Sequence, residues 1–313
     1  MSSHPKYINA QESGLLKERL ETVKNRMTSC HLCPRQCGVN RLKGESGVCK
    51  TGHQARVSAA FAHFGEETPL VGSNGSGTIF FSYCNLLCNF CQNYETSHEG
   101  EGRTFIDEEL AEIMLNLQNK GCHNINFVTP SHVVFQILSA LEIAIENGLC
   151  IPLVYNTSAY DSVETLKLLD GIIDIYMPDF KFWNNEIAEK TCRAGNYPQI
   201  AQKAINEMFR QVGDLKINRD GIATEGLLIR HLVLPNNLAG TREIMHFIAT
   251  QISKKTYTNI MPQYRPCGEA CQMKLMASHV TGDEFHEALN EAKQAGIQRL
   301  DKECSKINFP FYL

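Results

Sequence analysis

Three cysteines stand close together in the stretch TIFFSYCNLLCNFCQNYETS, at Cys84, Cys88 and Cys91, directly after an apolar run. Cysteine thiolates hold iron–sulfur clusters, and four of them are needed to saturate a four-iron cube. Three leave one iron open, and an open position at a catalytic metal is where a substrate or cofactor binds. The alternatives are a zinc ion completed by a distant residue such as His98, or a set of free thiols. The apolar loop CNLLCNFC would shield a cluster from water and favours the first interpretation.

A second group of cysteines lies nearer the N-terminus, with the spacing Cys30-x2-Cys33-x3-Cys37-x11-Cys49. Four soft ligands at short spacings suit a tetrahedral zinc ion or an iron–sulfur cluster. We therefore expect a metal-binding module here that holds either structural zinc or an auxiliary four-iron cluster. Unmetallated thiols are the third alternative.

The remaining cysteines and one acidic pair lie outside these groups. Glu66 and Glu67 could line the mouth of a pocket, although paired acids on a loop are more often solvated. Cys267 and Cys271 follow the last expected strand, where ordinary loop thiols are favoured over a redox or substrate-contact role. The simplest expectation for the six scattered cysteines is that they are buried small hydrophobes: Cys122, Cys150, Cys192, Cys267, Cys271 and Cys304.

Alternating strands and helices must position these residues. Short apolar, β-branched runs predict strands, and amphipathic segments closed by glycines predict helices between them. Strands that are apolar on both faces and alternate with helices indicate a parallel sheet, so six such units predict an open doubly wound sheet or a partial barrel. The expected strands are 78–83, 124–129, 152–157, 172–177, 227–234 and 257–264, and the expected helices are 12–27, 107–121, 131–148, 161–171, 201–215, 241–253 and 282–296.

Composition limits the class of protein. The chain has 313 residues, of which 43% are hydrophobic, and its formal net charge is −4. The excess of positive charge typical of a dedicated nucleic-acid binder is missing, so nucleic acid is not an expected partner. The first residues lack the order of a secretory signal, and no apolar run approaches the roughly 18 residues that span a bilayer. We expect a cytoplasmic protein that does not bind membranes.

The motif C-x3-C-x-aromatic-C, in which Phe90 precedes the third cysteine, resembles the hallmark of the radical S-adenosylmethionine (SAM) superfamily. This resemblance implies a partial (β/α)6 TIM-like barrel and a [4Fe-4S] cluster held by Cys84, Cys88 and Cys91. It also implies that SAM binds the open iron and is cleaved reductively to a 5′-deoxyadenosyl radical. Phe90 is then a candidate to pack against the nucleobase.

The segments SCHLCPRQCG, YNTSAYDS, MPDFKF and YTNIMPQYRP narrow the resemblance to the pyruvate formate-lyase activating enzyme-like group. This group implies abstraction of a hydrogen atom from a glycine of a partner glycyl-radical enzyme, with flavodoxin or ferredoxin as the electron donor. Modification of a small molecule, peptide or RNA by the same radical is the alternative within the superfamily. A non-catalytic module with zinc at both cysteine groups is the alternative of another class.

The same resemblance assigns residues to the cofactor. Asp179 and Lys181, in MPDFK, lie beside SAM in the group. A monovalent cation touching the SAM carboxylate is implied at Asp179, the Met177 backbone and the third-strand pair Asn156 and Thr157. Carboxylate and carbonyl oxygens suit a hard cation. Asn156 stands where the activases have an aspartate, so one negative charge is missing.

One departure concerns the second strand, which usually ends in Gly-Gly-Glu and binds the amino group of SAM. The chain has VTPSHV there, so Thr129, Ser131 or a backbone carbonyl must replace those contacts, with His132 a weaker candidate. On the fifth strand, Arg230 is the candidate to contact the cofactor, because an inward-facing arginine needs an anionic partner such as a carboxylate.

We expect three parts along the chain. Residues 1–56 form an N-terminal helix and the four-cysteine module, residues 57–281 form the radical SAM barrel, and residues 282–313 form a C-terminal helix and tail packed on the barrel.

Overall fold

The computed structural model describes residues 4–301, so Cys304 and the tail expected to pack on the barrel beyond residue 301 lie outside the described residues. Within this range one ten-stranded sheet has the order β10-β9-β8-β6-β5-β4-β2-β1-β3, with β7 paired to β8. The strands are β1 (Ala55–His63), β2 (Ser76–Phe81), β3 (Arg103–Phe105), β4 (Ile125–Val128), β5 (Leu153–Thr157), β6 (Ile175–Pro178), β7 (Lys216–Ile217), β8 (Ala223–Leu232), β9 (Tyr257–Met261) and β10 (Arg299–Leu300).

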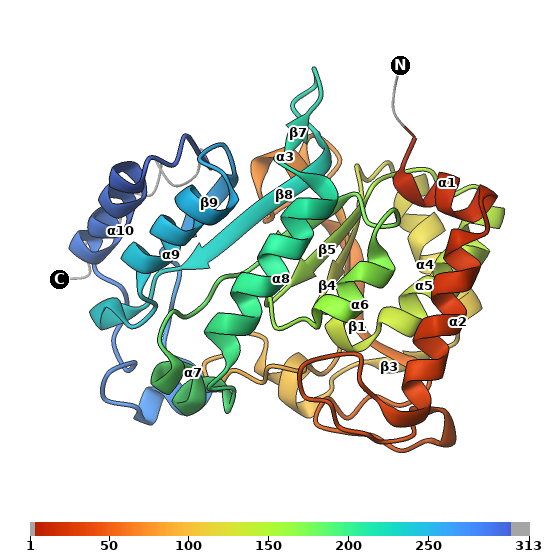
Figure 1. The fold of residues 1–313 in the computed structure, drawn as a ribbon, viewed down its shortest axis with the longest axis horizontal. Coiled ribbons are helices and arrows are strands. Elements are labelled where there is room, and N and C mark those ends of the chain that lie inside the picture. The colour runs from red at the N-terminus through yellow and green to blue at the C-terminus, as the bar shows by residue number, and fades with distance from the viewer. Residues whose placement is uncertain (1–3, 302–313) are drawn as a thin grey trace.

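The helices precede the first strand or lie in the connections between strands (Figure 1). They are α1 (Lys6–Glu12), α2 (Leu15–Arg26), α3 (Thr68–Val71), α4 (Asp107–Asn119), α5 (Val134–Glu146), α6 (Val163–Leu166), α7 (Asn185–Cys192), α8 (Tyr197–Val212), α9 (Thr241–Phe247) and α10 (Gly282–Ala295). The expected helix over 12–27 starts late, because Gly14 adopts φ +77° and separates α1 from α2. No helix of residues 4–301 is long and apolar enough to cross a bilayer.

The sheet topology decides between the two expected architectures. The strands β2, β4, β5, β6, β8 and β9 are mutually parallel neighbours and follow one another across the sheet in chain order. A doubly wound sheet would reverse direction at a switch point, whereas this order keeps right-handed crossovers on one face. The sheet is open, with β3 and β10 at its ends. The partial barrel is confirmed, and the doubly wound alternative is wrong.

Local sequence explains why the elements form and stop. Five of the six residues of β2 are buried, as expected for a parallel strand covered on both faces. The α10 helix begins with a capping box in which Thr281 Oγ1 accepts from the Glu284 amide and Glu284 Oε2 accepts from the Thr281 amide. Gly296, at φ +89°, ends it.

The N-terminal segment packs on the barrel. The α2 helix lies beside α5, and the side chain of Tyr7 on α1 donates to the carbonyl of Ile151. The cysteine-rich segment after α2 lies at the bottom of the view in Figure 1. The strand β1 begins at Ala55, and the expected boundaries of the three parts stay predictions.

Candidate active site

The three-cysteine loop starts where β2 ends, at the carboxyl edge of the parallel sheet, where α/β barrels carry their active sites. Two non-glycine residues of this loop, Tyr83 and Leu87, have positive φ angles of +66° and +57°. Backbone strain of this kind clusters at functional sites. The Leu86 amide donates to Cys84 Sγ at 3.3 Å.

The three thiols share a crowded, mostly buried environment. Burial raises the pKa of Cys84 to about 12, with a further contribution from neighbouring Cys88, and burial also raises the pKa of Cys91. The free loop therefore favours neutral thiols, and binding of a metal would release their protons. No three or more His, Cys, Asp or Glu side chains within residues 4–301 are placed to hold a single metal ion. A donor set of three thiolates on one short loop fits a four-iron cluster that leaves one iron open.

Arg35, from the N-terminal cysteine segment, joins the loop to helix α7. Its guanidinium donates to the Asn85 carbonyl at 2.9 Å, the Leu86 carbonyl at 3.1 Å, the Cys192 carbonyl at 2.8 Å and the Arg193 carbonyl at 2.5 Å. The sequence alone did not single out this residue, because its partners are 50 to 158 positions away.

We expect Arg35→Met to lower the free energy of unfolding by about 2–4 kcal/mol, because several carbonyls lose charged hydrogen-bond donors. The Arg35→Lys variant keeps the charge but not the planar set of donors, so its free energy of unfolding should lie between those of Arg35→Met and the wild type. Urea unfolding of the metal-free proteins measures the effect. Equal stability of all three proteins would contradict the role assigned to Arg35.

Two of the scattered cysteines contact the loop. Cys192 Sγ, at the end of α7, lies 3.3 Å from Cys88 Sγ, and the Cys267 thiol donates to the Phe90 carbonyl at 3.0 Å. The expectation of burial holds for Cys122 and Cys192. It is wrong for the others within residues 4–301, because these lie on connecting segments at the surface: Cys150 and Cys271 are exposed, and Cys267 is half-buried.

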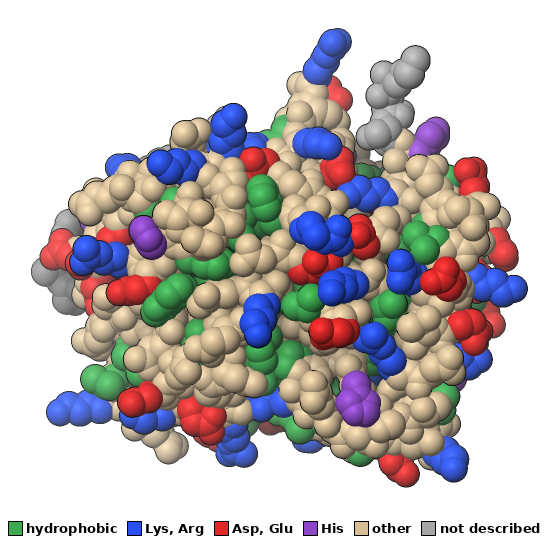
Figure 2. All heavy atoms as spheres, viewed as in Figure 1, with side chains coloured by type: hydrophobic (Ala, Val, Ile, Leu, Met, Phe, Trp, Pro, Cys, Tyr) green, Lys and Arg blue, Asp and Glu red, His purple; other side chains and the backbone are tan. Residues whose placement is uncertain are grey.

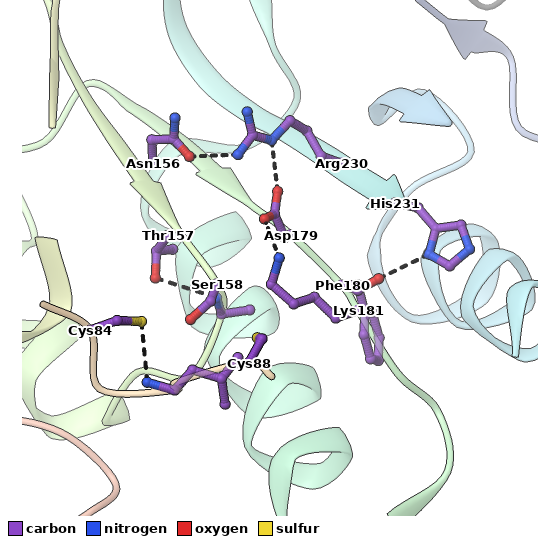
Figure 3. Close-up of polar contacts among 12 residues, drawn as sticks. Cys84, Cys88, Asn156, Thr157, Ser158, Asp179, Phe180, Lys181, Arg230 and His231 are labelled. Carbon is purple, nitrogen blue, oxygen red and sulfur yellow. Dashed lines mark hydrogen bonds and ion pairs between the residues drawn. The ribbon is translucent and has the colours of Figure 1, made fainter. Parts of the chain in front are cut away.

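A charged cluster forms at the ends of β5, β6 and β8 (Figure 3). Arg230 Nε donates to Asp179 at 2.7 Å, and its Nη2 donates to Asn156 Oδ1 at 2.7 Å. Lys181 Nζ donates to the other Asp179 oxygen at 2.7 Å. The guanidinium of Arg230 and the ammonium of Lys181 lower the pKa of Asp179 against the opposing effect of burial. A monovalent cation at Asp179 and Asn156 would have to displace these donors.

Glu66 and Glu67 complete the cluster, and the expectation that they are solvated is wrong. Arg230 lies 3.4 Å from Glu66 and 4.0 Å from Glu67, and Glu67 also accepts from Asn259 at 2.8 Å. The fold brings this loop over β8 and β9, which the local sequence could not reveal. Burial raises the pKa of Glu67 to about 7, although Arg230 opposes the shift.

This raised pKa predicts a pH dependence of stability. Between the ordinary glutamate pKa of about 4.3 and the folded value, the folded state keeps a proton that the unfolded state has lost. The stabilisation is therefore complete below about pH 4.3 and is lost as pH rises through the folded pKa. Relative to that of Glu67→Gln, the free energy of unfolding of the wild type should fall by on the order of a few kcal/mol between pH 5 and pH 8. A difference in free energy of unfolding between the two proteins that urea unfolding shows to be the same at pH 5 and pH 8 would contradict this prediction.

The residues at the ends of β4 and β5 form a hydrogen-bonded chain. Ser131 Oγ lies 3.0 Å from Thr157 Oγ1, which donates to Asp161 at 2.6 Å. Thr129 is strained, with φ +61°, and its amide donates to the Asn156 carbonyl. Asp161 is a buried acid that sequence reasoning did not place at the site. Ala159, two residues before Asp161, also has a positive φ angle, of +60°.

Phe90 and Met177 are part of the core. The ring of Phe90 packs edge-on against Phe182, with centroids 5.7 Å apart, and lies 6.0 Å from the ring of Tyr264. Met177 is fully buried, and its strand pairs it with Asn156. The structure thus brings the predicted residues of β5, β6 and β8 together, while their roles toward SAM stay predictions.

Two buried polar atoms near these strand ends lack a hydrogen-bond partner in the described part of the chain. Glu67 Oε2 and Ser158 Oγ are buried and have no hydrogen-bond partner among residues 4–301. Buried polar atoms are nearly always satisfied in functional proteins. The amino, carboxylate and ribose hydroxyl groups of SAM are polar partners of the kind these atoms lack.

Comparison with known proteins agrees with this chemistry. Residues 78–225 match the model of the Radical SAM superfamily. The chain is 34% identical over 294 residues to the uncharacterised protein MJ0674 of Methanocaldococcus jannaschii, covering 91% of this chain and 80% of that protein. The chain belongs to the radical SAM superfamily. Members of this family are enzymes that use a [4Fe-4S] cluster and SAM.

Solved structures with a similar fold are more distant. They include HydG, a maturase of the [FeFe]-hydrogenase, at 14% identity and a TM-score of 0.47 over 70% of this chain and 48% of that one. Methylornithine synthase (PylB) is 16% identical, with a TM-score of 0.48, over 71% of this chain and 63% of that one. The structure of anSMEcpe with bound AdoMet is 13% identical, with a TM-score of 0.47, over 68% of this chain and 57% of that one. The chain therefore spans about half to two thirds of the length of these proteins.

Proposed function

We propose that the protein is an activase-like radical SAM oxidoreductase that abstracts a hydrogen atom from a glycine of a partner glycyl-radical enzyme. The main observation in support is that the three-cysteine loop at the end of β2 lies beside the polar ends of β4, β5, β6 and β8. When bound, the cluster and SAM supply a one-electron reductive cleavage that yields the 5′-deoxyadenosyl radical. Flavodoxin or ferredoxin would supply the electron.

The chain's own residues bind and orient the cofactor in this proposal. Cys84, Cys88 and Cys91 hold the cluster and leave one iron for SAM. Arg230 and Lys181 supply the positive charge that a SAM carboxylate needs, and Asp179 holds both of them in place. Because these cations already satisfy Asp179 and Asn156, the proposal requires no monovalent cation there. Thr129, Ser131 and Thr157 are the proposed contacts to the amino group.

The substrate assignment is supported by the resemblance of the motifs YNTS and MPDFK to the activase group. The relative from M. jannaschii is itself uncharacterised and adds no support. On the face shown in Figure 2, acidic and basic side chains are interspersed. This distribution gives no electrostatic support for a nucleic-acid substrate on that face.

A radical-transfer assay tests the proposal. The reduced, cluster-loaded protein is mixed with SAM and a candidate glycyl-radical enzyme whose glycines carry deuterium. The expected result is deuterium in 5′-deoxyadenosine together with a glycyl-radical EPR signal on the partner. If 5′-deoxyadenosine forms without deuterium and candidate peptides or small molecules are consumed instead, the activase assignment is wrong while the radical chemistry stands.

A further inference from the structure

Cys88 and Cys192 form a close pair of buried thiols. The Cys192 thiol donates to Cys88 Sγ at 3.3 Å, and the two residues are 2% and 8% exposed, respectively. A disulfide joins its sulfurs at about 2.0 Å, so an approach of about 1.3 Å would bring these two atoms to bonding distance. The residues are 104 positions apart along the chain, so the fold alone brings them together.

Backbone contacts hold the two cysteines near each other without involving their sulfurs. The amide of Asn89, next to Cys88, donates at 2.8 Å to the carbonyl of Thr191, next to Cys192. Arg35 donates to the Cys192 carbonyl at 2.8 Å and to two carbonyls of the three-cysteine loop at 2.9 and 3.1 Å. The loop is therefore fixed to the last turn of α7, and the approach of the two sulfurs is a property of the fold.

The other thiols near the loop have different partners. Cys84 Sγ accepts from a backbone amide of its own loop, and the Cys267 thiol donates to the Phe90 carbonyl. Within residues 4–301, only the pair of Cys192 and Cys88 has one cysteine thiol donating to another cysteine sulfur. The four N-terminal cysteines line a small cavity to which neither member of the pair belongs, and a metal there stays a prediction: Cys30, Cys33, Cys37 and Cys49.

We propose that Cys192 is the resolving thiol of Cys88, and that hydrogen peroxide converts the pair to a disulfide when Cys88 holds no iron. Peroxide first oxidises Cys88, the more exposed of the two: an S–O bond forms, the O–O bond breaks, and water leaves a sulfenic acid. The sulfur of Cys192 then attacks the sulfur of Cys88. An S–S bond forms, the S–O bond breaks, and a second water leaves with the Cys192 proton. The two sulfurs lose the two electrons that one peroxide molecule gains.

The disulfide protects a proposed cluster ligand. A sulfenic acid without a resolving thiol is oxidised further to sulfinic and sulfonic acids, which thiol reductants do not reverse, whereas they do reverse a disulfide. After oxidative loss of the cluster, reduction would therefore return Cys88 for a new cluster. This protective role rests on the proposed function, in which Cys88 holds the cluster, but formation of the disulfide does not.

Disulfide mapping of the full-length protein, with its iron removed by a chelator, tests the pairing. The thiols are reduced with dithiothreitol, the reductant is removed without oxygen, equimolar hydrogen peroxide is added, and the remaining thiols are blocked with N-ethylmaleimide. Mass spectrometry of peptides that separate Cys84, Cys88 and Cys91 should show a Cys88–Cys192 disulfide that dithiothreitol removes. A disulfide of Cys88 with Cys84 or Cys91 instead, or no disulfide at Cys88, would overturn the proposal.

Cys192→Ala and Cys267→Ala are a matched pair of variants for the protective role, because both thiols contact the loop but only that of Cys192 contacts a sulfur. Each protein is treated with peroxide and then with dithiothreitol, and its iron content is measured after anaerobic reconstitution. The wild type and Cys267→Ala should regain the iron content of their untreated samples. Cys192→Ala should carry sulfinic or sulfonic acid at Cys88 and regain less iron.

Equal recovery of iron in all three proteins would overturn the protective role. Absence of iron from the untreated, reconstituted wild type would instead contradict the proposed function, while the mapped disulfide would still decide the pairing of Cys88 with Cys192.

Discussion

Cys88→Ala is expected to form 5′-deoxyadenosine no faster than a protein-free control, because a cube with two of its three protein thiolates is not retained in a form that binds SAM. The measurement is 5′-deoxyadenosine by mass spectrometry after anaerobic reconstitution, reduction and addition of SAM. Cys84→Ala and Cys91→Ala should behave in the same way.

Cys192→Ala is the matched control, since its sulfur lies 3.3 Å from Cys88 Sγ yet is not part of the motif. We expect this variant to fold and to cleave SAM. Loss of SAM cleavage in Cys192→Ala together with its retention in Cys88→Ala would instead identify Cys192 as a cluster ligand.

Arg230→Met is expected to lower the free energy of unfolding by about 3–5 kcal/mol, because it leaves buried carboxylates without their shared counter-charge. Arg230 contacts Asp179 and Glu66 and lies within ion-pair distance of Glu67, and its side chain is 17% exposed. The midpoint of urea unfolding at pH 8 measures the effect, because all three acids are most highly charged there among the conditions used.

Adding Glu67→Gln to Arg230→Met tests whether charge causes the loss of stability. The double variant Arg230→Met/Glu67→Gln should recover part of the lost stability, since one buried negative charge is removed together with the positive one. A loss below about 1 kcal/mol in Arg230→Met, or no recovery in the double variant, would show that packing rather than charge determines the effect.

The fold was predictable because its signals are local. Strands such as β2 and β5 are continuous apolar runs, and helices such as α10 carry their own start and stop residues. The three-cysteine loop was predictable for the same reason, since its spacing lies within one short segment. The choice between an open doubly wound sheet and a partial barrel needed the order of strands, which periodicity does not encode.

The contacts that sequence reasoning missed join residues far apart along the chain. Arg35 binds carbonyls 157 and 158 positions away, and Glu66 meets Arg230 across 164 positions. An acidic pair on a loop gives no local sign that it will be buried against an arginine. Cys192 looked like an ordinary core cysteine, and only the packing of α7 on the loop places it beside Cys88.

EPR of the reduced wild-type protein shows whether the loop of Cys84, Cys88 and Cys91 leaves one iron for SAM. Spectra are recorded with and without saturating SAM. We expect SAM to change the signal of one cluster, and we expect this change to be absent in the Cys84→Ala/Cys88→Ala/Cys91→Ala variant. A cluster signal in the wild type that is unaltered by SAM would contradict this expectation.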